Sequence, residues 1–235
     1  MSEQKPKLVL LPGLDGTGEL FVDFVMALPD AFEVVVVRYP VDASLSYVQL
    51  AKLVGAAIPV SEPYVLLAES FSTPLAIQVA ATNPANLKGL ILCAGFASSP
   101  VTGWLRFIYL KLAPMAFWFA IPDFVIRLLL TGTDAPASLL AAVRAAISVV
   151  KPMVMSTRVS EVLSCDKRAE LERITAPILY IQGKQDRLVR VRCLTEIMKI
   201  RLQTVVMPVE GPHLLLQREP RQTAEIVANL IRQLE

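Results

Sequence analysis

The sequence predicts an α/β protein: a mostly parallel sheet of about six strands with helices on both faces and one inserted helical segment. Short apolar runs alternate with segments of helical periodicity, which is typical of parallel strands joined by crossover helices. One stretch of roughly 80 residues between two of these runs has no strand pattern, and a structureless loop of that length is rare in a compact domain. That stretch is therefore interpreted as a helical insertion.

Six runs are interpreted as strands because they are apolar throughout, as expected for strands that are buried on both faces. They are Lys7–Leu11, Glu33–Arg38, Tyr64–Ala68, Lys88–Ala94, Pro177–Gln182 and Gln203–Pro208. Helical periodicity indicates helices between them, at about Leu20–Leu28, Leu45–Ile58, Phe71–Thr82, Arg190–Lys199 and Gln222–Gln233.

The insertion is the most apolar part of the chain. Of the 50 residues from 101 to 150, about 34 are hydrophobic, whereas the rest of the chain is close to an ordinary globular composition. Pro114, Pro122, Gly132 and Pro136 interrupt this segment, so we expect several short helices.

Composition excludes several classes of function. The 235 residues carry 23 basic and 21 acidic side chains, and a net charge of +2 predicts no nucleic-acid partner. His213 is the single histidine, which excludes a histidine-rich metal site. We expect no metal and no cofactor. The longest uncharged run of the apolar segment, Leu112–Pro122, is shorter than the ~20 residues that span a bilayer.

The first residues of the sequence and the cysteines indicate the cellular compartment. The first residues are polar and lack the apolar core of a signal peptide. Cys93, Cys165 and Cys193 are odd in number and have no metal-binding spacing, so neither disulfides nor zinc are expected. These observations predict a cytoplasmic protein.

A serine lies where the third predicted strand meets a helix, in Ala68–Ser72 (AESFS). Small residues two positions before and after Ser70 relieve the crowding of a sharp strand-to-helix turn, which lifts a nucleophile above the sheet. Ser72 is the weaker candidate, because Pro74 would then occupy the second small position. Alternatively, either serine is only an N-cap of the helix.

A base and an acid follow downstream in the order serine, aspartate, histidine. His213, in a Gly-Pro-His turn after the last predicted strand, is the sole candidate for a base that activates a serine hydroxyl. Asp186 follows the fifth predicted strand and a glycine turn, where it would orient the imidazole or, alternatively, cap the next helix. Asp134 and Asp166 are weaker candidates because neither follows a strand.

The loop after the first strand, Leu11–Gly18 (LPGLDGTG), is rich in glycine. A phosphate-binding loop is disfavoured because the loop lacks Gly-Lys-Ser/Thr and has the wrong glycine spacing for a dinucleotide site. The other interpretation is an oxyanion loop, in which the backbone N–H groups of Leu14 and Phe71 hold a tetrahedral oxyanion.

With these motifs in this order, the chain resembles the α/β-hydrolase family, and its LPGxDGTG loop is similar to that of an esterase/lipase-like subgroup related to plastid acyltransferases. The resemblance implies a serine hydrolase with Ser70 as nucleophile, Asp186 as acid and His213 as base. It also implies a core domain at 1–98 and 169–235 and a helical cap at 99–168.

Three departures from the family pattern bear on this expectation. Pro12 stands where the family often has histidine, and Ser72 replaces the last glycine of the elbow. The few residues before Lys7 leave no room for the hairpin that usually opens the fold, which predicts a trimmed sheet.

The aromatic residues of the segment 99–168 are candidates for an apolar acyl pocket. We expect Trp104, Phe107, Phe117 and Trp118 to contact substrate, although packing within the segment would also explain them. Three cations lie among these aromatics and would favour weak contact with a membrane surface; they are Arg106, Lys111 and Arg127.

Together the motifs predict a carboxylic ester hydrolase that acts on a small apolar ester through an acyl-enzyme. Two alternatives use the same chain: an acyltransferase with the same triad, or a non-catalytic binder of a small apolar ligand. The oligomeric state is left open.

Overall fold

The computed structural model describes residues 7–104, 106–108, 110–111, 117 and 121–234. Its centre is one sheet of six strands in the order β2-β1-β3-β4-β5-β6, and every neighbouring pair is parallel. The strands are β1 (Lys7–Leu11), β2 (Glu33–Val36), β3 (Tyr64–Glu69), β4 (Leu87–Cys93), β5 (Ile178–Gly183) and β6 (Val205–Val209). The predicted fold class is therefore confirmed.

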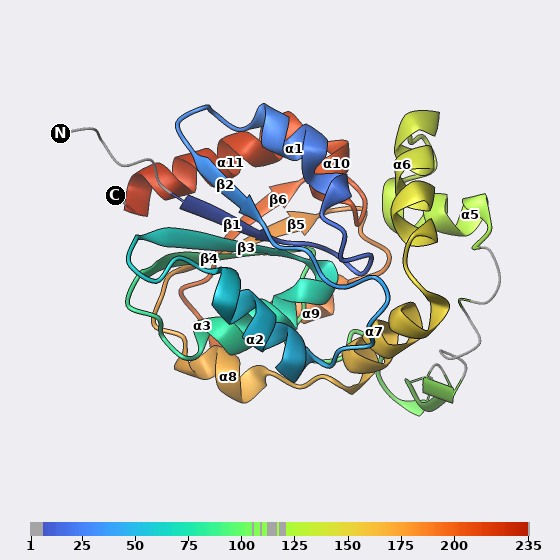
Figure 1. Ribbon diagram of the computed structural model, residues 1–235, viewed down its shortest axis with the longest axis horizontal. Coiled ribbons are helices and arrows are strands. Elements are labelled where there is room, and N and C mark those ends of the chain that lie inside the picture. Colours follow the sequence, from blue (N-terminus) through green and yellow to red (C-terminus); the bar gives the residue numbers. More distant parts are fainter. Residues whose placement is uncertain (1–6, 105, 109, 112–116, 118–120, 235) are drawn as a thin grey trace.

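Helices cover both faces of the sheet (Figure 1). One face carries η1 (Glu19–Phe21), α1 (Val22–Ala27), α10 (Leu215–Arg218) and α11 (Pro220–Leu234). The other carries α2 (Tyr47–Ala57), η2 (Ser70–Ser72), α3 (Thr73–Ala80), α8 (Arg168–Arg173) and α9 (Val191–Ile200). The short helices α8 and α10 were not among the sequence predictions, because one or two turns give too little periodicity to recognise.

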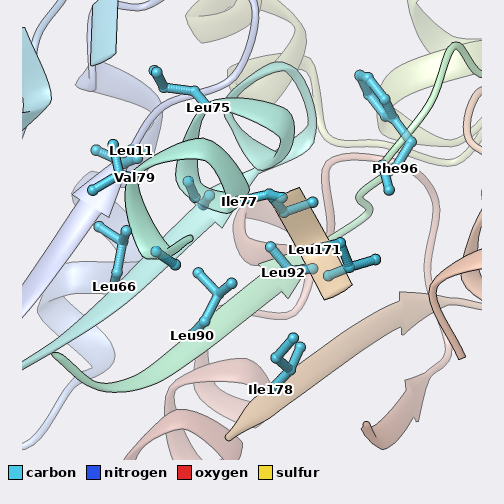
Figure 2. Packing of buried hydrophobic residues seen from close by; sticks show 14 of the residues in the cluster. Leu11, Leu66, Leu75, Ile77, Val79, Leu90, Leu92, Phe96, Leu171 and Ile178 are labelled. Atoms are coloured by element: carbon cyan, nitrogen blue, oxygen red, sulfur yellow. The ribbon is translucent and has the colours of Figure 1, made fainter. Parts of the chain in front are cut away.

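Two apolar cores lie on the two faces of the sheet, because side chains of a strand alternate between its faces. Leu11, Leu66 and Leu90 belong to the core on the face of α2 and α3, and Figure 2 shows them near Ile77 and Val79 of α3. Their neighbours along the strands face α1 and α11 in the second core. Strands β1, β3 and β4 are buried on both faces, which explains their continuous apolar sequences.

The two outer strands differ from the expectation of burial on both faces. In β6, Val205 is 53% exposed and Met207 is 36% exposed, and the residues of β2 are half-buried or exposed. Both are edge strands of the sheet, so they lack a neighbour on one side. Pro208 fits such a position, since an edge strand tolerates a residue without a backbone N–H.

The segment expected to form the insertion, residues 99–168, lies between β4 and β5 and contains α5 (Asp123–Ile126), the π-helical turn η3 (Arg127–Thr131), α6 (Ala137–Ser148) and α7 (Pro152–Ser164). The expected interruptions at Pro122, Gly132 and Pro136 separate these elements, and the one at Pro114 lies outside the described residues. In Figure 1 these helices gather on one side of the molecule, beyond the sheet.

The two ends of the insertion meet. The Ser99 N–H donates to the Cys165 carbonyl at 3.1 Å, and the Lys167 N–H donates to the Ala97 carbonyl at 2.7 Å. The segment thus leaves and re-enters the α/β core at one place.

No single helix of the described residues is long and apolar enough to cross a membrane. The bent pair α6 and α7, with an angle of 99° between them, meets the length and composition criteria only when the two helices are taken together.

Candidate functional site

Ser70 lies at the sharp turn between β3 and η2, at the carboxyl end of a central strand. Its φ angle is +47°, a left-handed conformation that costs free energy for a residue with a Cβ. The Thr73 hydroxyl donates to the Ser70 carbonyl at 2.8 Å and helps to hold this turn. The turn places the serine hydroxyl at the edge of the sheet, ahead of the helix that follows.

The structure brings Ser70, His213 and Asp186 together in one hydrogen-bonded chain. His213 Nε2 lies 2.8 Å from Ser70 Oγ, and His213 Nδ1 lies 2.8 Å from Asp186 Oδ2. The side chains of His213 and Asp186 are 2% and 4% exposed. Ser70 and His213 are 143 positions apart in the sequence, and Asp186 and His213 are 27 apart, so only the fold makes them neighbours.

The loop that carries Asp186 packs against the loop that carries His213. A Cβ on Gly183 would lie 2.6 Å from the Pro212 carbonyl oxygen, so a side chain there would force the two loops apart. The Gln185 N–H also donates to the Gly211 carbonyl at 3.0 Å. Glycine at the end of β5 thus lets Asp186 reach the imidazole.

Asp186 is itself oriented by its own loop. Its Oδ1 accepts hydrogen bonds from the backbone N–H groups of Leu188 and Val189, both at 2.8 Å, which leaves Oδ2 for His213. Burial opposes a charge on His213, but the charge and hydrogen bond of Asp186, with the charge of Glu69, raise its pKa above the ordinary value. The surroundings of His213 therefore favour its protonated form.

Ser72 anchors the glycine-rich loop after β1. The Ser72 side chain is fully buried, and its hydroxyl donates to the Pro12 carbonyl and lies 2.6 Å from the Tyr39 hydroxyl. Within the loop, the Asp15 carboxylate accepts from the Thr17 N–H at 2.9 Å and from the Thr17 hydroxyl. Ser72 is thus a structural anchor of the loop and has partners other than the histidine.

Of the two expected oxyanion donors, Phe71 lies within the turn after β3, and Leu14 lies in the glycine-rich loop that Ser72 contacts at Pro12. Among the described residues, none accepts a hydrogen bond from the Leu14 N–H. The Phe71 N–H belongs to the first turn of η2, where helical N–H groups lack intrahelical acceptors. The Tyr47 hydroxyl donates to the Phe71 carbonyl at 2.7 Å, and the two rings stack with centroids 5.0 Å apart.

Glu69, the residue before Ser70, is a buried carboxyl group. Its side chain is 1% exposed, Gln217 Nε2 donates to its Oε2 at 3.2 Å, and its Oε1 has no partner among the described residues. Burial, helped by the charge of Asp15, raises the pKa of Glu69 to about 7, although His213 and Gln217 act in the opposite direction. A pKa of about 7 predicts that Glu69 titrates near neutral pH.

This raised pKa predicts a pH-dependent stability. The folded protein binds the Glu69 proton more tightly than the unfolded chain, so its contribution is complete below about pH 4.5 and is lost as the pH rises through about 7. From pH 5 to pH 8, we expect Glu69→Gln to gain up to about 3 kcal/mol of unfolding free energy relative to the wild type. Urea unfolding at several pH values measures this difference.

The matched control is Glu225→Gln, because Glu225 is exposed on α11. It should follow the wild-type pH dependence. If the difference between Glu69→Gln and the wild type stayed constant from pH 5 to pH 8, Glu69 would not titrate in this range.

The four aromatic residues expected to contact substrate are placed differently from one another. Trp104 is 70% exposed and Phe107 is 67% exposed. Phe117 is half-buried and packs with Leu14 against a small apolar cluster of the insertion, Val150, Val154 and Met155. Trp118 lies outside the described residues. Their contact with substrate stays a prediction.

A cavity of about 560 Å³ borders the acid loop. Leu128 and Leu129 of the insertion line one part of it, and Asp186, Arg187 and Arg190 line another. No group of three or more His, Cys, Asp or Glu side chains in the described part of the chain is arranged to hold a metal ion.

Four residues that contact the glycine-rich loop were not predicted from the sequence: Glu69, Tyr39, Arg158 and, in its role as an anchor, Ser72. Arg158 of α7 donates to the carbonyls of Leu14 and Asp15. A charged residue within the largely uncharged helix 152–164 is the signal that could have indicated Arg158, but its partners are far away in the sequence.

Comparison with known proteins identifies the class. A protein-family model with the description "Alpha/beta hydrolase family" matches residues 8–226, which is most of the chain. The chain therefore belongs to the alpha/beta hydrolase family. No curated protein matches the sequence significantly.

Solved structures share the fold at low sequence identity. An enol-lactonase from Burkholderia xenovorans is 16% identical with a TM-score of 0.83, over 98% of this chain and 92% of that chain. A lipase-esterase related protein from Clostridium acetobutylicum is 16% identical with a TM-score of 0.77, over 97% and 95%. A bromoperoxidase from Bacillus anthracis is 14% identical with a TM-score of 0.85, over 97% and 92%.

Proposed function

We propose that this member of the family is a serine hydrolase that cleaves carboxylic esters through an acyl-enzyme. The observation that carries the proposal is the chain Ser70–His213–Asp186, whose two hydrogen bonds are both 2.8 Å long. A serine with a base within hydrogen-bond reach, itself oriented by a buried acid, is the arrangement that makes a hydroxyl nucleophilic. We assign the catalytic roles to these three residues.

In the acylation half, His213 Nε2 accepts the proton of Ser70 while Oγ forms a bond to the ester carbonyl carbon. The carbonyl oxygen takes the electron pair and becomes an oxyanion, which the N–H groups of Leu14 and Phe71 stabilise. When the tetrahedral intermediate collapses, the bond to the alkoxy oxygen breaks, and His213 gives its proton to the departing alcohol. Asp186 stabilises the imidazolium throughout.

Deacylation repeats the steps with water. His213 takes a proton from a water molecule, whose oxygen attacks the acyl carbon, and returns that proton to Ser70 Oγ as the acid leaves. The imidazole must gain and lose a proton in each half-reaction, and the charge of Asp186 stabilises its protonated form.

We further propose that residues 99–168 form the cap of this site and favour an apolar acyl group. The support is local: Phe117 and the cluster of Val150, Val154 and Met155 pack against Leu14, one of the assigned oxyanion donors. The three cysteines of the chain are free and buried, which suits a reducing compartment such as the cytoplasm.

A fluorophosphonate probe tests the proposal directly. We expect Ser70 Oγ to form a bond to phosphorus as fluoride leaves, with the serine proton passing to His213. Intact mass and peptide sequencing then locate one adduct on Ser70. Ser148, an exposed serine of α6 whose hydroxyl donates to the Ala145 carbonyl, serves as the matched site that should stay unlabelled.

Product analysis then separates hydrolysis from acyl transfer. With an apolar ester and an added alcohol, free acid alone supports the hydrolase, and a new ester supports an acyltransferase that uses the same residues. A protein that neither takes the label nor turns over any ester is instead a non-catalytic binder, and the proposal is then wrong.

A further inference from the structure

Arg158 of helix α7 has its side chain buried inside the protein. The side chain of Arg158 is 2% exposed, and no carboxylate in the described part of the chain forms an ion pair with it. A buried cation is stable only when its donors are satisfied, so its actual partners are informative.

Those partners are backbone carbonyls. Nη1 donates to the Leu14 carbonyl at 2.8 Å and to the Asp15 carbonyl at 2.6 Å, and Nη2 donates to the Pro40 carbonyl at 2.9 Å. The guanidinium also lies 5.8 Å from the centroid of the Tyr39 ring, within range of a cation–π interaction. Two of the three carbonyls thus belong to the loop that follows β1.

This loop contains the N–H assigned to the oxyanion. The Gly13 carbonyl accepts from the Gly16 N–H at 3.0 Å. Because C=O and N–H of a trans peptide point in opposite directions, this bond directs the Leu14 N–H away from the turn. Arg158 holds the next carbonyl, that of Leu14. The peptide groups on both sides of Leu14 are therefore fixed, one by the turn and one by α7.

The loop sequence leaves room for the guanidinium. A Cβ on Gly16 would lie 2.7 Å from Arg158 Nη1, and the φ angle of Gly16 is +68°, a conformation that favours glycine. Only a glycine at this position allows the loop to fold around the arginine.

We propose that Arg158 is a positioning residue that joins helix α7 to the loop Leu11–Gly18 and fixes the direction of the Leu14 N–H. It touches no reacting atom in this assignment and acts through the backbone of Leu14 and Asp15. The segment 99–168 therefore contributes to the geometry of the oxyanion site as well as to its surroundings. This inference rests on the proposed ester hydrolysis.

Steady-state kinetics of Arg158→Ala and Arg158→Lys test the proposal. We expect kcat to fall by roughly 30- to 100-fold in both, at or below the loss of about 10²- to 10³-fold seen when an oxyanion donor is removed, while KM stays within about twofold. Lysine cannot replace the planar fork that reaches several carbonyls at once. The control is Arg144→Ala, because Arg144 is exposed on α6 and should leave kcat unchanged.

A rescue experiment distinguishes positioning from a purely structural role. Millimolar methylguanidinium should restore kcat several-fold in Arg158→Ala, because it can occupy the vacated site, and should not affect the wild type or Arg144→Ala. A folded Arg158→Lys with wild-type kcat overturns the proposal. So does a loss of activity that only tracks the loss of folded protein in both variants, without rescue.

The outcomes also separate this inference from the proposed function. A wild-type protein that hydrolyses no ester contradicts the proposed function. An active wild type whose Arg158 variants keep their kcat contradicts only the role of Arg158.

Discussion

Ser70→Ala is expected to lower kcat for p-nitrophenyl esters by at least about 10⁴-fold, because no other hydroxyl of the described residues is bonded to His213. Alanine removes only Oγ, and the turn is held by backbone contacts and by Thr73, so the variant should remain folded. Its free energy of unfolding should stay close to that of the wild type, since Ser70 is only half-buried and the positive φ angle is retained. The measurement is kcat and KM over esters of increasing acyl length.

The matched control for this variant is Ser148→Ala, which removes an exposed hydroxyl and should keep wild-type kinetics on every ester. Ser72→Ala does not serve as a control, because its hydroxyl holds Pro12 and Tyr39. A Ser70→Ala protein that retains more than a small fraction of the wild-type kcat would remove Ser70 from the mechanism.

Asp186→Asn is expected to lower kcat by about 10³- to 10⁴-fold without unfolding the protein. The asparagine carbonyl oxygen can still accept from the Leu188 and Val189 N–H groups, as Asp186 Oδ1 does. Its NH₂ group then faces His213 Nδ1 and favours the tautomer with the proton on Nε2. That tautomer cannot accept the proton of Ser70.

The same variant should also shift the pH profile. The charge of Asp186 raises the pKa of His213, so its removal lowers that pKa and moves the acid limb of kcat/KM to lower pH. Asp166→Asn is the matched control, because Asp166 is exposed and pairs with Arg168. If Asp186→Asn kept the wild-type kcat, or if its acid limb moved to higher pH, Asp186 would not be the acid partner.

Much of the fold was predictable because the sequences of the central strands are almost continuously apolar, which indicates burial on both faces. Lys7–Leu11 matches β1 at both ends, and the other five predicted strands overlap the observed ones. Edge exposure was not predictable for β6, because Val205 and Met207 are as apolar as core residues and only the strand order leaves them at the rim.

For the site, local patterns indicated the residues of the chain Ser70–His213–Asp186, because each follows a strand at the carboxyl edge of a parallel sheet. The contacts of Glu69 and Arg158 were not predictable. Their partners, Gln217 and the carbonyls of Leu14 and Asp15, are more than 140 positions away, and no periodicity relates such positions.

The meeting of the two ends of the insertion has a consequence for how such chains diversify. Since Ser99 and Lys167 are bonded to Cys165 and Ala97 respectively, the segment between them can change in length or sequence at a small cost in chain entropy, and the sheet need not adjust. If residues 99–168 act as the proposed cap, a graft of another protein's segment at this junction is expected to change the choice of acyl group. It would also remove Arg158, so the donor would have to supply a guanidinium of its own, or recover catalysis by reshaping Leu11–Gly18.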